Sequence, residues 1–167
     1  DTELLVVLDS EKDSTYKILK KSNLNLTILI NDLGPGVSKA INYAIQKSKG
    51  RYICVAMGDG SDDPRQVEEL LLLVQRGLSV AVASRYSRGG QFVGSKNTKY
   101  LISKYSGFFL NFFFRIGTKD PTNMFKAYDK KFLEVVKVES DVGFTLGLEM
   151  IVKAKIYKKN VGEVPTI

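Results

Sequence analysis

Short apolar runs alternate along this chain with segments of helical periodicity. The apolar runs occupy residues 4–8, 26–30, 52–57 and 78–83. Each has the length and the β-branched content of a buried strand. The intervening segments place apolar side chains at helical spacing, as Val37, Ala40 and Ile41 do. Strands that alternate with helices in this way indicate a three-layer α/β/α fold with a mostly parallel sheet.

The pattern changes beyond residue 98. Residues 101–116 form a wide apolar stripe rich in phenylalanine, with Lys99 and Lys104 near its start and Arg115 near its end. A helix buried in the core and a helix lying in a membrane interface both fit this pattern. The remaining expected elements are an extended segment at 124–128, helices at 130–136 and 146–157, and a strand at 161–164.

The most informative stretch is residues 51–77. Its strand runs into Gly58-Asp59-Gly60-Ser61-Asp62-Asp63-Pro64, and a helix is expected over 65–76. Asp63 suits the N-cap, with Pro64 at the first helical position and Gln66 completing a capping box. A cap does not explain Asp59, which lies before the helix between two glycines that allow close approach of a ligand.

This cluster of carboxylates falls at the carboxyl edge of the expected parallel sheet, where open α/β sheets bind their ligands. A hard divalent cation typically bridges one or two carboxylates to the phosphates of a substrate. The spacing therefore predicts a metal–phosphate site, beside the simpler alternative that Asp63 only caps a helix.

Composition narrows the chemistry. The 167 residues carry a net charge of +7 and no histidine. The absence of histidine excludes His-based triads, His–zinc sites and imidazole acid–base catalysis. The lone Cys54 is expected to be a core residue. The positive charge favours anionic partners, such as phosphates, nucleic acid or an acidic membrane surface. The simpler interpretation is a basic surface without such a partner. No uninterrupted apolar run reaches the roughly 20 residues that span a bilayer.

Several blocks resemble the inverting glycosyltransferases of the dolichol-phosphate mannosyltransferase type, in the order and spacing of that family. The blocks are Val6-Val7-Leu8-Asp9-Ser10, Gly34-Pro35-Gly36, Met57-Gly58-Asp59, Ala83-Ser84-Arg85-Tyr86, Asp120-Pro121-Thr122-Asn123-Met124-Phe125-Lys126-Ala127-Tyr128, and Gly143-Phe144 with Glu149. Each block alone is a weak signal, and together they cover nearly the whole chain. In this resemblance Met57 replaces the first aspartate of the metal-binding DxD motif, and Asn123-Met124 replaces Ser-Gly.

The resemblance implies the GT-A fold, the Rossmann-like fold of nucleotide-diphospho-sugar transferases. Residues 1–167 then look like a single glycosyltransferase domain that is truncated at both ends and lacks the first strand of the family. The implied activity moves a sugar from a nucleotide-sugar donor, GDP-mannose or a UDP-hexose, to a polyprenyl or dolichyl phosphate with inversion. The resemblance also implies Mg²⁺ or Mn²⁺ as cofactor and a cytoplasmic location at the face of a membrane. Nucleic acid is not expected as a partner, because the aromatic residues cluster on one apolar helix and do not alternate with basic ones.

On the donor side, the resemblance assigns Asp59 to catalysis, through the metal and the diphosphate. Asp62 and Asp63 are candidates for further metal ligands, and Asp9 is the candidate contact for the nucleotide. The simpler interpretation of Asp9 is a carboxylate that only caps the turn after its strand.

On the acceptor side, the resemblance gives Arg85 a catalytic role in binding the acceptor phosphate, together with Lys99 and Ser103. A phosphate acceptor is already ionised at neutral pH, so a site without histidine suffices. The simpler interpretations are a surface cation at Arg85 and a lysine that snorkels from an apolar helix at Lys99.

A second enzymatic hypothesis sends the sugar to a hydroxyl of a glycan or protein. A hydroxyl must lose a proton, so this reaction requires a carboxylate base such as Asp62, Asp63 or Asp120.

Overall fold

The computed structural model describes residues 2–94, 98–136, 138–140 and 145–167. The elements in chain order are β1 (Leu5–Leu8), α1 (Ser14–Lys21), β2 (Thr27–Ile30), α2 (Val37–Lys47), β3 (Tyr52–Val55), α3 (Gln66–Gln75), β4 (Val80–Ser84), α4 (Thr98–Phe114), β5 (Lys126–Asp129), α5 (Lys130–Val135), α6 (Thr145–Ile156) and β6 (Val161–Pro165). The alternation of strands and helices expected from the apolar runs is confirmed.

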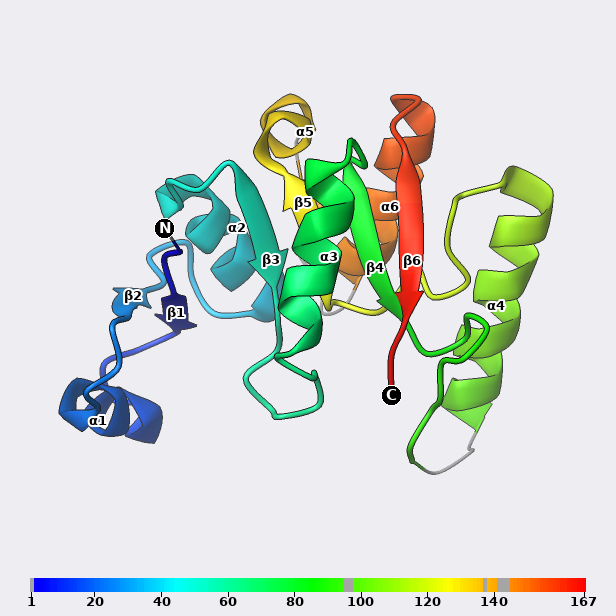
Figure 1. Ribbon diagram of the computed structural model, residues 1–167. Helices are drawn as coiled ribbons and strands as arrows, with labels where there is room; N and C mark the ends of the chain where they lie inside the picture. Colours follow the sequence, from blue (N-terminus) through cyan, green and yellow to red (C-terminus); the bar gives the residue numbers. More distant parts are fainter. Residues whose placement is uncertain (1, 95–97, 137, 141–144) are drawn as a thin grey trace.

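The strands form a parallel pair, β1 with β2, and a four-stranded sheet in the order β3-β5-β4-β6. β4 and β6 are parallel, whereas β5 runs antiparallel to both β3 and β4. Strands β3, β4 and β6 therefore share one direction, and Figure 1 shows their carboxyl ends at the same edge. The α/β fold with a mostly parallel sheet is confirmed, with β5 as an antiparallel exception that the sequence did not reveal.

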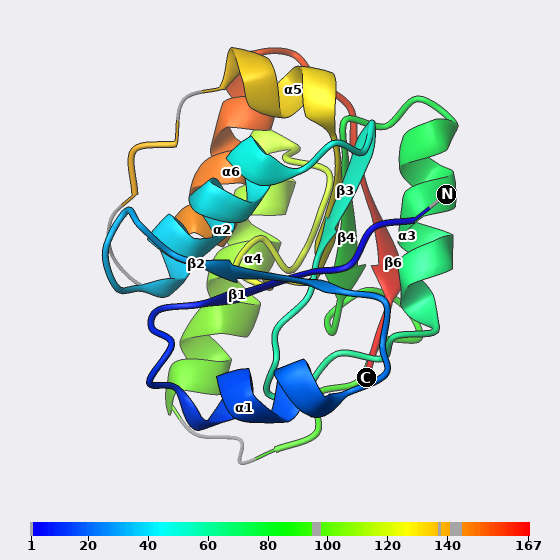
Figure 2. The same cartoon turned by 90° about the vertical axis from the view of Figure 1, so that its left-hand side faces the viewer.

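Helices cover both faces of the four-stranded sheet, with α3 on one side and α2 and α6 on the other (Figure 2). Strands β3 and β4 are almost continuous apolar runs. Successive side chains of a strand point to opposite sides, so both faces of the sheet are apolar there. Val80 and Val82 of β4 join the core beneath α6, and Ala81 and Ala83 join the core beneath α3.

The long helix α4 lies at the edge of the molecule beyond β6 (Figure 1). Its phenylalanine side chains are exposed, so the interpretation of this stripe as a core helix is wrong. The side that faces the protein carries small residues: a Cβ atom at Gly107 would lie 2.1 Å from the carbonyl oxygen of Lys119. Helical periodicity locates an apolar face, but it does not say what covers that face.

Within the part of the chain that the structure describes, no helix combines the length and the apolar character needed to cross a bilayer.

Candidate functional site

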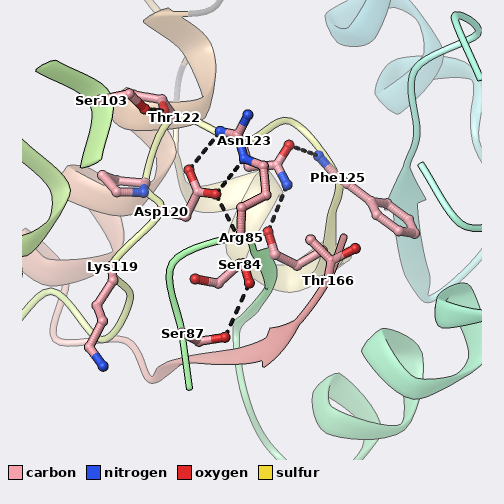
Figure 3. Close-up of polar contacts among 12 residues, drawn as sticks. Ser84, Arg85, Ser87, Ser103, Lys119, Asp120, Thr122, Asn123, Phe125 and Thr166 are labelled. Atoms are coloured by element: carbon pink, nitrogen blue, oxygen red, sulfur yellow. Dashed lines mark hydrogen bonds and ion pairs between the residues drawn. The ribbon is translucent and has the colours of Figure 1, made fainter. Parts of the chain in front are cut away.

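The site is organised around an ion pair between the residue that follows β4 and a buried carboxylate. Arg85 donates from Nε to Asp120 Oδ2 at 2.7 Å and from Nη2 to Oδ1 at 2.9 Å, and its backbone N–H donates to Oδ2 at 3.0 Å (Figure 3). Asp120 is fully buried. The charge-assisted hydrogen bonds that Arg85 donates to Asp120 raise the pKa of Arg85. The guanidinium is therefore a permanent cation held in one orientation.

Aromatic rings flank the same guanidinium. Its carbon lies 5.4 Å from the ring centroid of Tyr86 and 5.8 Å from that of Phe92. Tyr100 of α4 packs against both rings, with centroids 6.0 and 4.7 Å away. The Arg85 side chain is 27% exposed, so it is accessible to a ligand yet fixed in place. The interpretation of Arg85 as a simple surface cation is wrong.

The loop that carries Asp120 is tied to two neighbouring elements. Asn123 donates from Nδ2 to the carbonyl oxygen of Ala83 in β4 at 2.7 Å. Ser103 Oγ of α4 lies 3.2 Å from Thr122 Oγ1 (Figure 3). Ser103, predicted to bind the acceptor phosphate, therefore meets the loop that orients Arg85. Its contact with an acceptor stays a prediction.

Lys126, the first residue of β5, is fully buried beneath this loop. Its Nζ donates to the carbonyl oxygens of Pro121 and Asn123. Burial lowers the pKa of Lys126 to about 7; the negative charge of Asp120 opposes the shift and the positive charge of Arg85 adds to it. Sequence reasoning missed this role, because nothing in the local pattern marks a lysine in a strand as buried.

The acidic loop after β3 presents two carboxylates of different character. Asp59 is exposed, and hydrogen bonds from the side chain of Ser61 and from its backbone N–H, the latter at 3.0 Å, lower the pKa of Asp59. Asp62 is partly buried and accepts from the backbone N–H of Met57 at 2.8 Å. Burial raises the pKa of Asp62; the charge of Asp59 raises it further and that of Arg85 lowers it. Asp62 thus lies within electrostatic range of both Asp59 and the Arg85 cation.

Asp63 is not the N-cap of α3 itself but caps the turn that leads into it, where its Oδ1 accepts from the backbone N–H of Arg65 at 3.0 Å. The N-cap of α3 is Arg65, which makes no side-chain capping hydrogen bond. Asp63 pairs with that arginine, Oδ2 to Nη2 at 2.8 Å. The predicted capping box is also wrong, because Gln66 donates instead to the carbonyl oxygen of Pro165 at 2.6 Å. A short backbone turn through Asp63 and Pro64 delays the start of the helix.

The carboxylates suit a cation that also binds a substrate. No group of three or more acidic, histidine or cysteine side chains that could hold a metal occurs in the described ranges. Asp59 and Asp62 nevertheless offer hard oxygen ligands, and Mg²⁺ is often held by one or two carboxylates plus substrate phosphates. The raised pKa of Asp62 reflects burial and neighbouring negative charge, and a cation at this point would relieve both. The residues present therefore fit the expected ion.

Met57 packs against the apolar core, so the residue that replaces the first aspartate of the DxD motif points away from this loop. Cys54, in the same strand, is a core residue as expected, and burial raises the pKa of its thiol to about 12.

Asp9 follows β1 and joins two loops. Its carboxylate accepts from Asn31 Nδ2 at 3.1 Å and from the backbone N–H of Gly36 at 3.3 Å. Both contacts reach the loop that follows β2, so they do not match the simpler interpretation of Asp9 as a cap of the turn after its own strand. Among the described residues, no contact joins Asp9 to Asp59 or Arg85, and its role toward a nucleotide stays a prediction.

The side chain of Lys99 and the residues Gly143 and Phe144 lie outside the part that the structure describes. The backbone of Lys99 belongs to the first turn of α4.

Replacing Asp120 by asparagine should destabilise the protein by about 3–5 kcal/mol, because it leaves the Arg85 cation without its buried counter-charge. Urea unfolding measures the change. Asp63→Asn, which breaks the solvent-exposed pair with Arg65, is the matched control and should leave stability nearly unchanged. Equal stability of the two variants would contradict the structural role of Asp120.

The stability of the protein should rise with pH between about 7 and 10 relative to that of Lys126→Met. The folded-state pKa of Lys126, about 7, lies below the unfolded value of about 10.4. The unfolded chain therefore binds more protons in this window, and raising the pH favours folding. Urea unfolding at several pH values should show a difference in slope of up to about 1.4 kcal/mol per pH unit. Lys17→Met, at an exposed lysine, is the control and should keep the wild-type dependence of stability on pH. The same dependence in the wild type and in Lys126→Met would show that Lys126 does not titrate in this way.

Comparison with known proteins places this arrangement in a family. Residues 1–136 match the family described as Glycosyl transferase family 2. The chain is 27% identical over 174 residues to a dolichol-phosphate mannosyltransferase of Pyrococcus furiosus. The alignment covers 98% of this chain and 47% of that protein. It is 28% identical over 171 residues to a polyprenol monophosphomannose synthase of Mycolicibacterium smegmatis, covering 97% and 64%.

A third relative is the low-salt glycan biosynthesis hexosyltransferase Agl6 of Haloferax volcanii, 28% identical over 168 residues, covering 96% of this chain and 38% of that protein. The chain thus spans between 38% and 64% of the length of these relatives. The match covers the acidic loop after β3 and the Arg85–Asp120 pair together. This chain belongs to glycosyl transferase family 2, and within it resembles the dolichol-phosphate mannosyltransferases.

Proposed function

We propose that this chain transfers a sugar from a nucleotide-sugar donor to a polyprenyl or dolichyl phosphate, with inversion. The observation that carries the proposal is the fixed Arg85 cation, which Asp120 and two aromatic rings hold beside an acidic loop. The names of two relatives refer to dolichol phosphate and to polyprenol monophosphomannose, which supports this class of acceptor.

On the acceptor side, the reaction requires a cation that binds and aligns the acceptor phosphate. A phosphate is ionised at neutral pH, so the attacking oxygen needs no base. Arg85 would bind this phosphate and align it with the sugar, and the orientation fixed in advance by Asp120 lowers the cost of that alignment. Ser103 and Lys99 of α4 are the further candidates to bind the same phosphate.

The donor side requires neutralisation of a departing diphosphate. Asp59 and Asp62 would hold Mg²⁺ or Mn²⁺, which supplies charge stabilisation for the leaving group when bound. Asp63 is the weaker candidate, because Arg65 already occupies its carboxylate. Asp9 would contact the nucleotide of GDP-mannose or a UDP-hexose. The reaction would take place at the cytoplasmic face of a membrane, where a lipid-linked acceptor presents its phosphate.

One observation keeps the hydroxyl-acceptor alternative in view. Asp120 cannot act as the base for it, because Arg85 engages both of its carboxylate oxygens. Asp63 is a poor base, because its pair with Arg65 lowers its pKa. The stronger candidate is Asp62, whose pKa burial raises. The two functions differ in the acceptor and in their need for this base.

Titration with Mg²⁺ and a nucleoside diphosphate should show coupled binding, in which each ligand tightens the other. Asp59→Ala should abolish the coupling, because it removes the exposed carboxylate of the acidic loop. Calorimetry with GDP and UDP, with and without metal, measures this. Glu134→Gln, at an exposed position on α5, is the control. A nucleotide affinity that depends neither on the metal nor on Asp59 would rule out this donor site.

Arg85→Gln should lower transfer to polyprenyl phosphate by at least about 100-fold, since a hydrogen-bonded transition-state contact is worth about 3 kcal/mol. Affinity for the nucleoside diphosphate should persist. The control is Arg88→Gln, an exposed arginine in the same loop. Radiolabelled transfer to polyprenyl phosphate is compared with transfer to a soluble oligosaccharide. Efficient transfer to the oligosaccharide that depends on Asp62, with none to the lipid phosphate, would replace this function by the hydroxyl-acceptor alternative.

A further inference from the structure

A cavity of about 710 Å³ lies at the end of the sheet opposite to the candidate site. It is lined by the segment that follows α4, by the end of α6 with the turn into β6, and by Leu78, which precedes β4. These segments meet at the amino-terminal ends of β4 and β6, whereas Arg85 follows the carboxyl end of β4 (Figure 1). The volume falls within the range of small-molecule sites, about 300–1,000 Å³. The proposed sugar transfer makes no use of this cavity.

The charged side chains that line this cavity are all positive. They belong to Arg115, Lys155, Lys158 and Lys159, and no aspartate or glutamate lines it. In the part of the chain that the structure describes, none of the four has an ion-pair partner. By contrast Lys153, also on α6, pairs with two glutamates at 2.9 and 2.6 Å. A hollow lined by charge of one sign focuses its field and attracts an anion.

Part of the lining is apolar and firmly packed. Ile116 is buried in the main core, and Leu78 and Val161 line the same cavity. A Cβ atom at Gly117 would lie 2.6 Å from the carbonyl oxygen of Val161, so the segment after α4 packs directly on the start of β6. The backbone N–H of Gly117 also donates to Asn111 Oδ1 at 3.0 Å. The cations therefore surround a hollow whose walls are held in place by the fold.

Two of the four cations occupy backbone positions that favour glycine. Arg115, which follows α4 directly, has a φ of +48°, and Lys158, two residues beyond α6, has a φ of +54°. Among the described residues, these are the non-glycine residues with a positive φ. A side chain at such a position strains the backbone, and strain of this kind is concentrated at functional sites. Here both strained residues bring a cation to the same cavity.

The end of α6 shows that the lysines are not needed to cap the helix. The backbone N–H of Lys158 donates to the carbonyl oxygen of Lys155 at 3.1 Å. The backbone N–H of Lys159 donates to that of Ala154 at 2.8 Å. These are the hydrogen bonds of a Schellman motif, in which glycine is the usual left-handed residue. The side chains of Lys158 and Lys159 thus remain available to a ligand.

We propose that this cavity binds a soluble ligand that carries two or more phosphate groups. Four cations line the cavity, and linked phosphates are the compact group that brings several negative charges into such a space. Lysine and arginine both bind phosphate through charge-assisted hydrogen bonds. The apolar part of the lining leaves room for an organic portion of the ligand. The inference goes beyond the proposed function, because the cavity lies at the opposite end of the sheet from Asp59 and Arg85 and requires no metal.

Calorimetry with inorganic tripolyphosphate in the presence of EDTA tests the charged lining. Lys155→Gln combined with Lys159→Gln should weaken binding by about tenfold or more, because two charge-assisted contacts are lost. Neither substitution touches a left-handed residue, and circular dichroism confirms that each variant is folded. Lys17→Gln combined with Lys21→Gln removes the same charge from the exposed side of α1 and is the matched control. This control should bind nearly as the wild type does.

Lys158→Gly separates binding from the ending of α6. Glycine adopts the left-handed conformation without strain, so this variant should resist urea better than the wild type. It should also bind tripolyphosphate severalfold more weakly, because one cation is lost. A gain in stability without any loss of affinity would contradict the role of Lys158 in binding.

Two further variants distinguish this cavity from the candidate site. In EDTA, Asp59→Ala and Arg85→Gln should each bind tripolyphosphate as the wild type does. Binding that Arg85→Gln abolishes, and that the Lys155 and Lys159 substitutions leave unchanged, would place the phosphates on the acceptor side and overturn the proposal. The transfer and metal-coupling tests of the proposed function do not involve the cavity, so either proposal can fail without the other.

Other sources of negative charge provide the last comparison. Tripolyphosphate should bind at least about tenfold more tightly than a hexaglutamate peptide, whose charges are spread over a longer chain. Equal affinity for the two would overturn the assignment to phosphates. Binding to phosphatidylglycerol vesicles with none to tripolyphosphate would overturn the assignment to a soluble ligand. The absence of wild-type binding at millimolar tripolyphosphate would overturn the site itself.

Discussion

The fold around the site depends on the need to neutralise one buried carboxylate. Asp120 has no access to solvent, and a buried charge is tolerated only when it is paired and hydrogen-bonded. Arg85 meets that need with three N–H donors. The pair joins the end of β4 to the loop that leads into β5, and so the neutralisation of Asp120 also fixes the cation at the carboxyl edge of the sheet.

Lys126 extends this arrangement below the loop. Its ammonium group donates to two backbone carbonyls of the segment that carries Asp120. The loop is thus held from above by Arg85 and from beneath by Lys126, and such connected polar networks rigidify the structure around them. A rigid loop keeps the Arg85 cation in one orientation at the carboxyl edge of the sheet.

The same loop positions α4. Gly107 contacts the carbonyl of Lys119, the residue before Asp120, and Ser103 contacts Thr122 two residues beyond it. The Arg85–Asp120 pair and the orientation of α4 therefore depend on one packed unit.

The sequence by itself determined the strands, the α/β class and the placement of Asp59 and Arg85 at strand ends, because apolar periodicity and turn residues act over a few neighbouring positions. It did not determine the N-cap of α3, where a local turn and Arg65 displaced the expected role of Asp63. Only the tertiary structure decided the direction of β5, the burial of Lys126, the outward turn of α4 and the pairing of Arg85 with Asp120, which lie 35 residues apart. Each of these depends on contacts between distant segments, and no short-range pattern encodes which segments meet.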